Sequence, residues 1–286
     1  MDFRRDTGAV MKGEKAMYIP PISFSYEYPE VQDQHMMKVI RKYSPALDES
    51  YTYRDKSFSW RWKHFWLNFF LNTIVLPVVK IRYAVKVEGK KNLRKNKKIL
   101  EGGFVTVCNH VIEWDFLALL WAFYPRKAYF PIWSVNMETA MAPLFKTIGA
   151  IPIPKSVHAG KKFTAAMDSV LDEGGWLHVF AEGSMWYFYP AIRNFHRGAA
   201  SFALRHKSPL LPLAISYRKP RGLYRLFKKY PNLTVHIGEP LFADEKLSHR
   251  DAAEDLTKRA RLSVMNMVGI KDEKENQRIM DMYKNQ

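Results

Sequence analysis

Cysteine is almost absent from this sequence, since Cys108 is the single one among 286 residues. A lone cysteine excludes an intrachain disulfide framework and a cysteine-rich zinc site, and it is typical of a reducing compartment. An apolar secretory signal is missing as well, because the first five residues are mostly charged and no apolar run follows them. We therefore expect a protein that is neither exported nor cleaved.

Acidic residues are scarce relative to basic ones. The chain has 45 Lys and Arg against 28 Asp and Glu, which gives a formal charge of +17 and an isoelectric point near 9.7. Such a balance favours anionic partners, either nucleic acid or an anionic lipid surface. The basic residues are dispersed rather than gathered in one recognition motif, and eight Trp suit a membrane interface. We expect an anionic membrane surface and no nucleic acid.

No apolar run reaches the roughly 20 residues that cross a bilayer as a helix. The longest apolar segment, 65–79, covers 15 positions and contains Asn68, Asn72 and Pro77, with lysines and arginines on both sides. Trp60 and the aromatic residues after it give this segment a helical character, which predicts a helix lying in the membrane interface. A buried amphipathic helix of a soluble domain is the alternative.

Three regions follow from composition. Residues 1–55 mix aromatics, prolines and charges and form an arm, which is expected to pack on the main domain or contact the membrane. Residues 56–85 are expected to form the membrane-interface helical segment, and 86–286 are expected to form the main domain. In this last region apolar strands alternate with helical periods, which predicts an α/β fold with a largely parallel sheet flanked by helices. The expected strands are 104–108, 149–153, 176–180, 210–215 and 233–237.

The sequence Asn109-His110, followed by Asp115, lies where the predicted strand 104–108 ends and a predicted helix begins. One helical turn separates the two side chains, so Asp115 can hold one imidazole nitrogen of His110 while the other nitrogen takes a proton. A Cys108–His110 thiolate pair is an alternative, although a small buried apolar residue also explains Cys108.

A second block, Phe180-Ala181-Glu182-Gly183-Ser184, follows another apolar strand. Glycine permits a tight turn and a close backbone approach to a ligand. Glu182 could orient hydrogen-bond donors or bind a polar acceptor, and a helix-capping turn with an exposed glutamate is the alternative.

Taken in order with two further blocks, Gly149-Ala150-Ile151-Pro152-Ile153-Pro154-Lys155 and Leu211-Pro212-Leu213-Ala214-Ile215, these motifs resemble the glycerophospholipid acyltransferase family. The resemblance is greatest to its bacterial lysophosphatidic acid acyltransferases and runs from about Val87 to Pro240. Lys155 stands where the family has arginine, and Met185 stands where the family has an arginine thought to hold the acceptor's phosphate.

The resemblance implies that His110 and Asp115 are catalytic. It further implies substrate binding by Asn109, Lys155, Glu182, Gly183 and Ser184, and Arg193 or Arg197 could supply the charge that Met185 lacks.

The resemblance also implies a reaction: a fatty acyl group passes from acyl-CoA or acyl carrier protein to the hydroxyl of a lysophospholipid, with lysophosphatidic acid as the first candidate. Neither a metal nor a cofactor is needed, and the enzyme is expected on the cytoplasmic face of a membrane as a peripheral or monotopic protein. Two alternatives are an acyltransferase for another lipid acceptor and a catalytically inactive lipid-binding relative.

Overall fold

The computed structural model of the chain describes residues 17–37, 39–42, 45–48, 50–154, 156–222, 224–227 and 230–284. Its strands are β1 (Lys86–Glu88), β2 (Phe104–Cys108), β3 (Ala128–Ile132), β4 (Ala150–Pro152), β5 (Trp176–Phe180), β6 (Leu210–Arg218) and β7 (Asn232–Ile237). Its α-helices are α1 (Phe58–Phe70), α2 (Leu76–Arg82), α3 (Lys90–Lys95), α4 (Lys97–Glu101), α5 (Asp115–Phe123), α6 (Ala142–Thr147), α7 (Val157–Asp172), α8 (Gly198–Arg205), α9 (Tyr224–Phe227), α10 (His249–Val268) and α11 (Glu273–Lys284). Short turns at Pro21–Ser25 and Ser134–Glu138 are 3₁₀ helices.

The strands form one sheet of seven in the order β1-β7-β6-β2-β5-β3-β4. Pairing is parallel throughout except between β6 and β7, so β1 and β7 run against the other five strands. The carboxyl ends of β2, β5 and β3 therefore meet side by side at one edge of the sheet, the position where open α/β sheets bind ligands. The predicted α/β class with a largely parallel sheet is confirmed.

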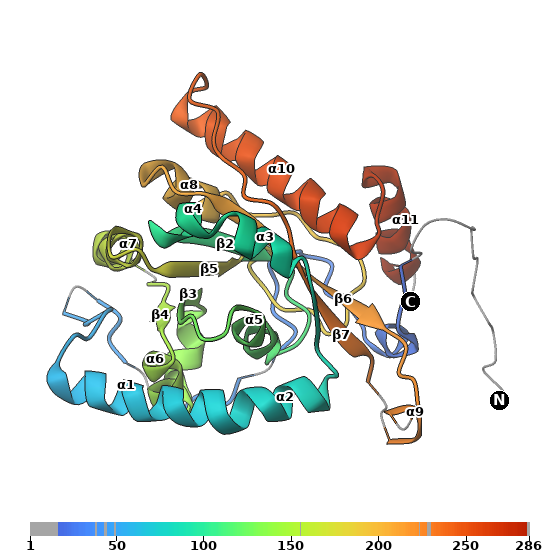
Figure 1. Cartoon of the computed structure of the whole chain (residues 1–286), viewed down its shortest axis with the longest axis horizontal. Coiled ribbons are helices and arrows are strands. Elements are labelled where there is room, and N and C mark those ends of the chain that lie inside the picture. Colours follow the sequence, from blue (N-terminus) through green and yellow to red (C-terminus); the bar gives the residue numbers. More distant parts are fainter. Residues whose placement is uncertain are drawn as a thin grey trace.

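Helices cover both faces of the sheet, as Figure 1 shows. One face packs against α5 and the α1–α2 region, and the other packs against α7, α8 and α10. The central strands are consequently enclosed on both sides, and every residue of β2 is buried. This explains why β2 and β5 are mostly apolar in the sequence rather than alternating; each has one buried polar residue at its centre, Thr106 and His178, which contact each other at 2.7 Å.

The predicted interfacial segment is one unbroken helix from Phe58 to Arg82, because a π-helical turn at Leu71–Val75 joins α1 to α2. The predicted helical character is confirmed, and the helix continues through Asn68, Asn72 and Pro77, which interrupt only the apolar run. Asn68 and Asn72 donate side-chain hydrogen bonds of 2.7 Å to carbonyls one turn earlier. Pro77 follows the π-turn directly and stands in the first turn of α2, where its missing N–H is tolerated.

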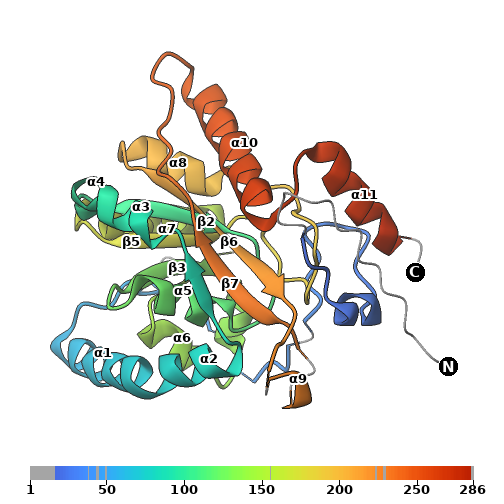
Figure 2. The same ribbon diagram turned by 45° about the vertical axis from the view of Figure 1, so that its right-hand side comes forward.

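This helix exposes a large apolar surface. Its exposed side chains are Phe58, Trp62, Phe65, Trp66, Phe69, Phe70, Ile74, Val78 and Ile81. Over its 25 residues the helix is long and apolar enough to cross a membrane, judged by length and composition alone. It lies along the base of the domain in Figures 1 and 2, with Leu76 and Val79 buried in the core.

The arm packs on the catalytic domain. Ser23 Oγ donates to the carbonyl of Phe188 at 2.6 Å, and Tyr28 Oη donates to the carbonyl of Tyr187 at 2.9 Å. The rings of Tyr28, Trp186 and Tyr189 lie within 6 Å of one another in stacked or edge contacts. Aromatic side chains of the arm thus contribute to its packing on the domain.

Candidate active site

His110 lies just beyond the carboxyl end of β2, and Asp115 is the first residue of α5. The Nδ1 atom of His110 lies 2.8 Å from Oδ2 of Asp115. The carboxylate is completely buried, whereas 21% of the histidine side chain is exposed. The arrangement matches the predicted pair: the carboxylate fixes one ring nitrogen, and Nε2 remains for proton transfer.

One oxygen of the Asp115 carboxylate is held by several hydrogen bonds, and the other oxygen accepts none from the described residues. Its Oδ2 also accepts hydrogen bonds from the backbone N–H of Val111 at 2.8 Å and Ile112 at 3.4 Å. Its Oδ1 is buried and has no hydrogen-bond partner among the described residues. A buried carboxylate with one bare oxygen stabilises a neighbouring cation, so it favours the imidazolium that forms when His110 accepts a proton.

Asn109 fixes the end of β2. Its side-chain amide donates to the carbonyl of Ile215 at 3.0 Å and accepts from the N–H of Ile215 at 2.8 Å. These two bonds replace backbone pairing with β6 at the point where β2 ends. The side chain is buried, and its contact with substrate stays a prediction.

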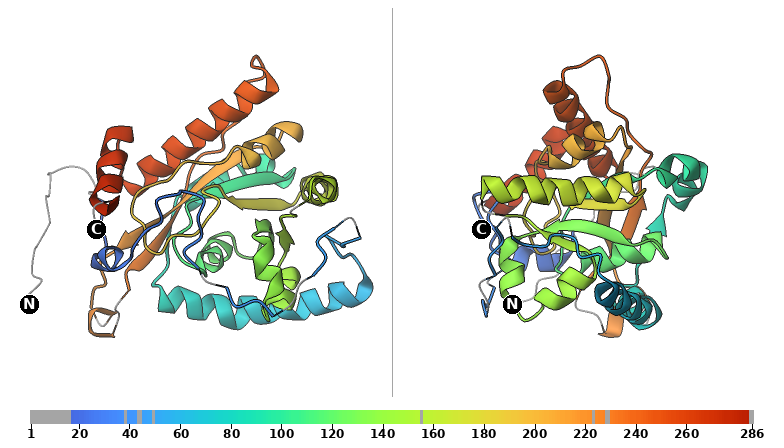
Figure 3. Two further views of the ribbon diagram at one scale, coloured as in Figure 1. Left: turned by 180° about the vertical axis from the view of Figure 1, so that it is seen from behind. Right: turned by 90° about the vertical axis from the view of Figure 1, so that its left-hand side faces the viewer.

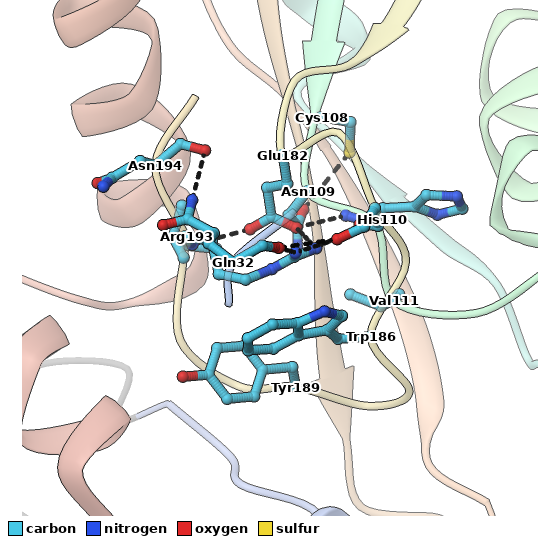
Figure 4. Close-up of polar contacts among 12 residues, drawn as sticks. Gln32, Cys108, Asn109, His110, Val111, Glu182, Trp186, Tyr189, Arg193 and Asn194 are labelled. Carbon is cyan, nitrogen blue, oxygen red and sulfur yellow. Dashed lines mark hydrogen bonds and ion pairs between the residues drawn. The ribbon is translucent and has the colours of Figure 1, made fainter. Parts of the chain in front are cut away.

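Glu182 and Arg193 form a buried pair behind the histidine, as Figure 4 shows. Glu182 Oε2 accepts from the backbone N–H of His110 at 3.0 Å and from Arg193 Nη2 at 3.1 Å, while Oε1 accepts from the Arg193 N–H at 2.9 Å. The imidazole of His110 points away from this pair in Figure 4. Glu182 therefore orients donors, the first of the two roles that the sequence left open.

Arg193 and Ser184 connect this pair to the arm. Arg193 Nη1 donates to Ser184 Oγ at 2.6 Å and to the carbonyl of Gln32 at 2.8 Å, and Ser184 Oγ donates to the same carbonyl at 2.9 Å. The guanidinium also lies 4.3 Å above the ring of Trp186. Only 1% of the Arg193 side chain is exposed, so it cannot reach a phosphate on a substrate without leaving these partners.

The remaining predicted residues lie apart from His110 or outside the described part. Gly183 adopts a positive φ of 78°, and a Cβ there would lie 2.9 Å from the ring of His196, so the turn needs glycine. Arg197 is exposed at the start of α8. Met185, in contrast, is buried. Lys155 lies outside the described residues.

Several residues at this edge were not predicted. The ring of Phe180, at the end of β5, stacks on His110 with centroids 4.0 Å apart. Tyr187 donates a hydrogen bond to the Glu113 carboxylate. Their part in the site depends on contacts between segments distant in sequence; Phe180 and Glu113 lay inside recognised blocks, and Tyr187 did not.

The arm brings a second imidazole to the same edge. His35 stacks face to face on Trp133, which follows β3, with centroids 4.0 Å apart. Burial lowers the pKa of His35, and the nearby His110 and Arg193 lower it further against an opposing effect of Asp33. The dense aromatic composition of the arm was the one sequence signal that it belonged near a pocket.

The thiol alternative receives no support. Cys108 is fully buried, and burial raises the pKa of its thiol well above the usual value. Its Sγ donates weakly to Asn109 Oδ1 at 3.4 Å. A thiol that stays protonated is a poor nucleophile. Across the described ranges, no three His, Cys, Asp or Glu side chains cluster as metal ligands would.

Part of the chain matches a known protein family. Residues 84–216 match the acyltransferase family model, a stretch that contains His110, Asp115, Glu182 and Arg193. The resemblance that the motifs indicated is thereby confirmed at the level of an acyltransferase domain.

A solved structure also resembles this acyltransferase: the 1-acyl-sn-glycerophosphate (LPA) acyltransferase PlsC from Thermotoga maritima. The two chains are 18% identical, the alignment covers 72% of this chain and 82% of that one, and the TM-score is 0.45. This likeness is too distant to transfer a role to any residue. No curated protein sequence matches the chain significantly.

Proposed function

We propose that this acyltransferase transfers a fatty acyl group from acyl-CoA or acyl carrier protein to the hydroxyl of a lysophospholipid, with lysophosphatidic acid as the acceptor and phosphatidic acid as the product. The hydrogen bond of 2.8 Å between His110 Nδ1 and the buried Asp115 carboxylate carries the proposal, because it leaves Nε2 as a base on a partly exposed ring.

The proposed reaction needs one base and no covalent enzyme intermediate. Nε2 of His110 takes the proton of the acceptor hydroxyl while the hydroxyl oxygen attacks the thioester carbonyl. The tetrahedral intermediate then collapses, the carbon–sulfur bond breaks, and the imidazolium returns its proton to the leaving thiolate. Asp115 stabilises the imidazolium between these steps.

We propose that the enzyme works on the cytoplasmic face of an anionic membrane as a peripheral or monotopic protein. Lys80 lies over the ring of Trp121 on α5, and His64 bonds the carbonyl of Thr147, the last residue of α6, so the long helix is attached to the domain at two points along its length. A helix fixed in this way would draw the domain into the bilayer if it spanned it. Lying in the interface keeps its aromatic face in lipid and the domain in water.

A different lipid acceptor is the second candidate, and the surroundings of Arg193 favour it. This arginine is committed to Glu182, Ser184 and Gln32, and Met185 carries no charge. The phosphate of lysophosphatidic acid would then depend on Arg197 or on Lys155. A catalytically inactive lipid-binding relative would bind lysolipid without releasing thiol.

The test offers purified full-length protein one labelled acyl thioester with a panel of lysolipids on vesicles. Mass spectrometry identifies the acylated product, and thiol release is followed in parallel. Labelled phosphatidic acid as the main product would support the proposal. If another acylated lipid is the main product, its lysolipid precursor is the acceptor. Lysolipid binding without thiol release would instead indicate a catalytically inactive lipid-binding protein.

A further inference from the structure

A second pocket, separate from the active site, lies beside β6 and β7 at the carboxyl end of α10. It is a groove of about 1020 Å³, and none of the predicted site residues lines it. Thr234 and His236 of β7 and Ser216 and Arg218 of β6 contribute to its floor, which gives it polar walls. A concave polar site of this size can take a charged ligand.

The groove is strongly basic. Its charged lining residues are Lys86, Arg218, Lys219, Arg221, Lys271 and Glu88. The carboxylate of Glu88 is already paired with Lys86 at 2.8 Å and with His236 at 3.3 Å. Five cations around one committed carboxylate leave a net positive potential in the groove, which attracts anions.

One guanidinium in the groove is fixed in place. Arg218 Nε donates to Thr234 Oγ1 at 2.7 Å, and Nη2 donates to the carbonyls of Ala84 and of Leu233, the latter at 3.1 Å. Burial lowers the pKa of Arg218; Glu88 raises it, and the neighbouring Arg221 lowers it. Two guanidinium groups of like charge held close together are stabilised by an anion that binds between them.

The rim of the groove belongs to a loop that reaches the lipid-facing end of the molecule. Lys219, Arg221 and Tyr224 line the groove and lie in the connection between β6 and β7, which contains α9. In Figures 1, 2 and 3, which differ by rotation about the vertical axis, α9 lies at the level of the α1–α2 helix. Neither sequence segment, 56–87 or 219–238, contains an acidic residue.

We infer that this groove binds the phosphate of an anionic membrane lipid, held by Arg218, Arg221 and Lys219, while the α1–α2 helix rests in the same leaflet. The two contacts lie at one end of the molecule, so together they would fix the orientation of the enzyme on the bilayer. A cation near an anionic surface contributes about 1 kcal/mol, or roughly a fivefold change in affinity. This inference concerns membrane contact and does not depend on acyl transfer.

The experiment compares Arg221→Ser with Arg225→Ser in the full-length protein. Arg225 is exposed on α9 in the same connection but does not line the groove, so it is a matched control of equal charge. Binding to phosphatidylcholine vesicles with and without phosphatidylglycerol is measured by cosedimentation. Arg221→Ser should weaken binding to the anionic vesicles well beyond the roughly fivefold loss that follows from removing any one cation at the surface, and Arg225→Ser about fivefold or less. Lys219→Ser gives a second groove variant.

Equal losses for Arg221→Ser and Arg225→Ser would mean diffuse attraction to the surface and would overturn the inference. Free coenzyme A, whose phosphates are soluble, serves as a second probe without vesicles. If it binds the wild type and loses affinity in Arg221→Ser while vesicle binding is unchanged, the groove takes a soluble phosphate and not a lipid. No acyl transfer occurs in either assay, so an inactive enzyme would not affect the outcome.

Discussion

At the residue scale, His110, the proposed base, is fixed at two points. Asp115 holds its ring through Nδ1, and Glu182 holds its backbone N–H. Glu182 in turn depends on Arg193, whose guanidinium reaches the arm through the carbonyl of Gln32. Removing one partner of such a buried ion pair leaves an uncompensated charge, so the network should respond as a unit.

Arg193→Lys should lower kcat about 10- to 100-fold while the KM for the acceptor changes little. Lysine keeps the charge but loses the planar fork that bonds Glu182, Ser184 and Gln32 together. Steady-state kinetics with varied acceptor separates the two constants. A large rise in acceptor KM with kcat preserved would show instead that Arg193 holds the head group, the role first suggested by the sequence.

His178, in the middle of β5, predicts how stability depends on pH. Burial lowers its pKa to about 3, with a further lowering from His110, and Thr106 Oγ1 lies 2.7 Å from its Nδ1. In the unfolded chain, His178 takes up a proton near pH 6.5. In the folded protein its buried ring stays neutral until the pH falls to about 3. This contribution to stability is therefore complete above pH 6.5 and declines as the pH falls below it, by about 1.4 kcal/mol per pH unit at most.

Urea unfolding of wild type and His178→Gln at several pH values between 4.5 and 7.5 measures that contribution. Because both proteins share all other titrating groups, the difference between their slopes isolates His178. The wild type should lose stability more steeply toward acid. Parallel slopes would mean that the buried ring does not resist protonation.

At the element scale, the exposed aromatic face of the α1–α2 helix should bind anionic vesicles. Replacing Trp62 and Trp66 with Ser should weaken this binding about tenfold or more, since each buried aromatic contributes over 1 kcal/mol, and added salt should weaken it further. Vesicle cosedimentation measures both effects. Carbonate should release the wild-type protein from membranes; retention would indicate a spanning helix.

The bounds of the strands and helices could be predicted from the sequence only in part. Strands enclosed on both faces, β2 and β5, have the predicted bounds 104–108 and 176–180, because burial on both sides leaves a mostly apolar segment with a single polar residue at its centre. β1 was not predicted, since Lys86–Glu88 is a short charged strand that exists through its pairing with β7. The C-terminal region forms two helices, α10 and α11, because Gly269 with φ 94° ends α10.

The candidate site, like the fold, could be predicted from the sequence only in part. The His110–Asp115 pair lies within one strand-to-helix junction, so its spacing was visible in the sequence. The contacts of Arg193 were not, because they join residues 32, 182 and 184, and a list of motifs cannot show that a charge is already paired. The roles of Arg197 and Lys155 stay predictions.

At the scale of the whole molecule, the arm and the long helix pack on different parts of the domain. The arm lies outside the matched stretch 84–216, yet it supplies Gln32 and His35 to the edge where β2, β5 and β3 end. The helix provides an apolar face at the base, and the basic groove lies at the same end. A protein of charge +17 arranged in this way is suited to an anionic lipid surface.

The central claim is that His110 is the base for acyl transfer to a lipid hydroxyl. The most direct test measures labelled acylated lipid formed from an acyl thioester by wild type, His110→Asn and Asp115→Asn, with folding and vesicle binding checked for each. Wild type should form product, His110→Asn should lose at least about 10³-fold in kcat, and Asp115→Asn should lose on the order of 10²-fold or more. If correctly folded His110→Asn kept turnover within a few-fold of wild type, His110 would not be the base.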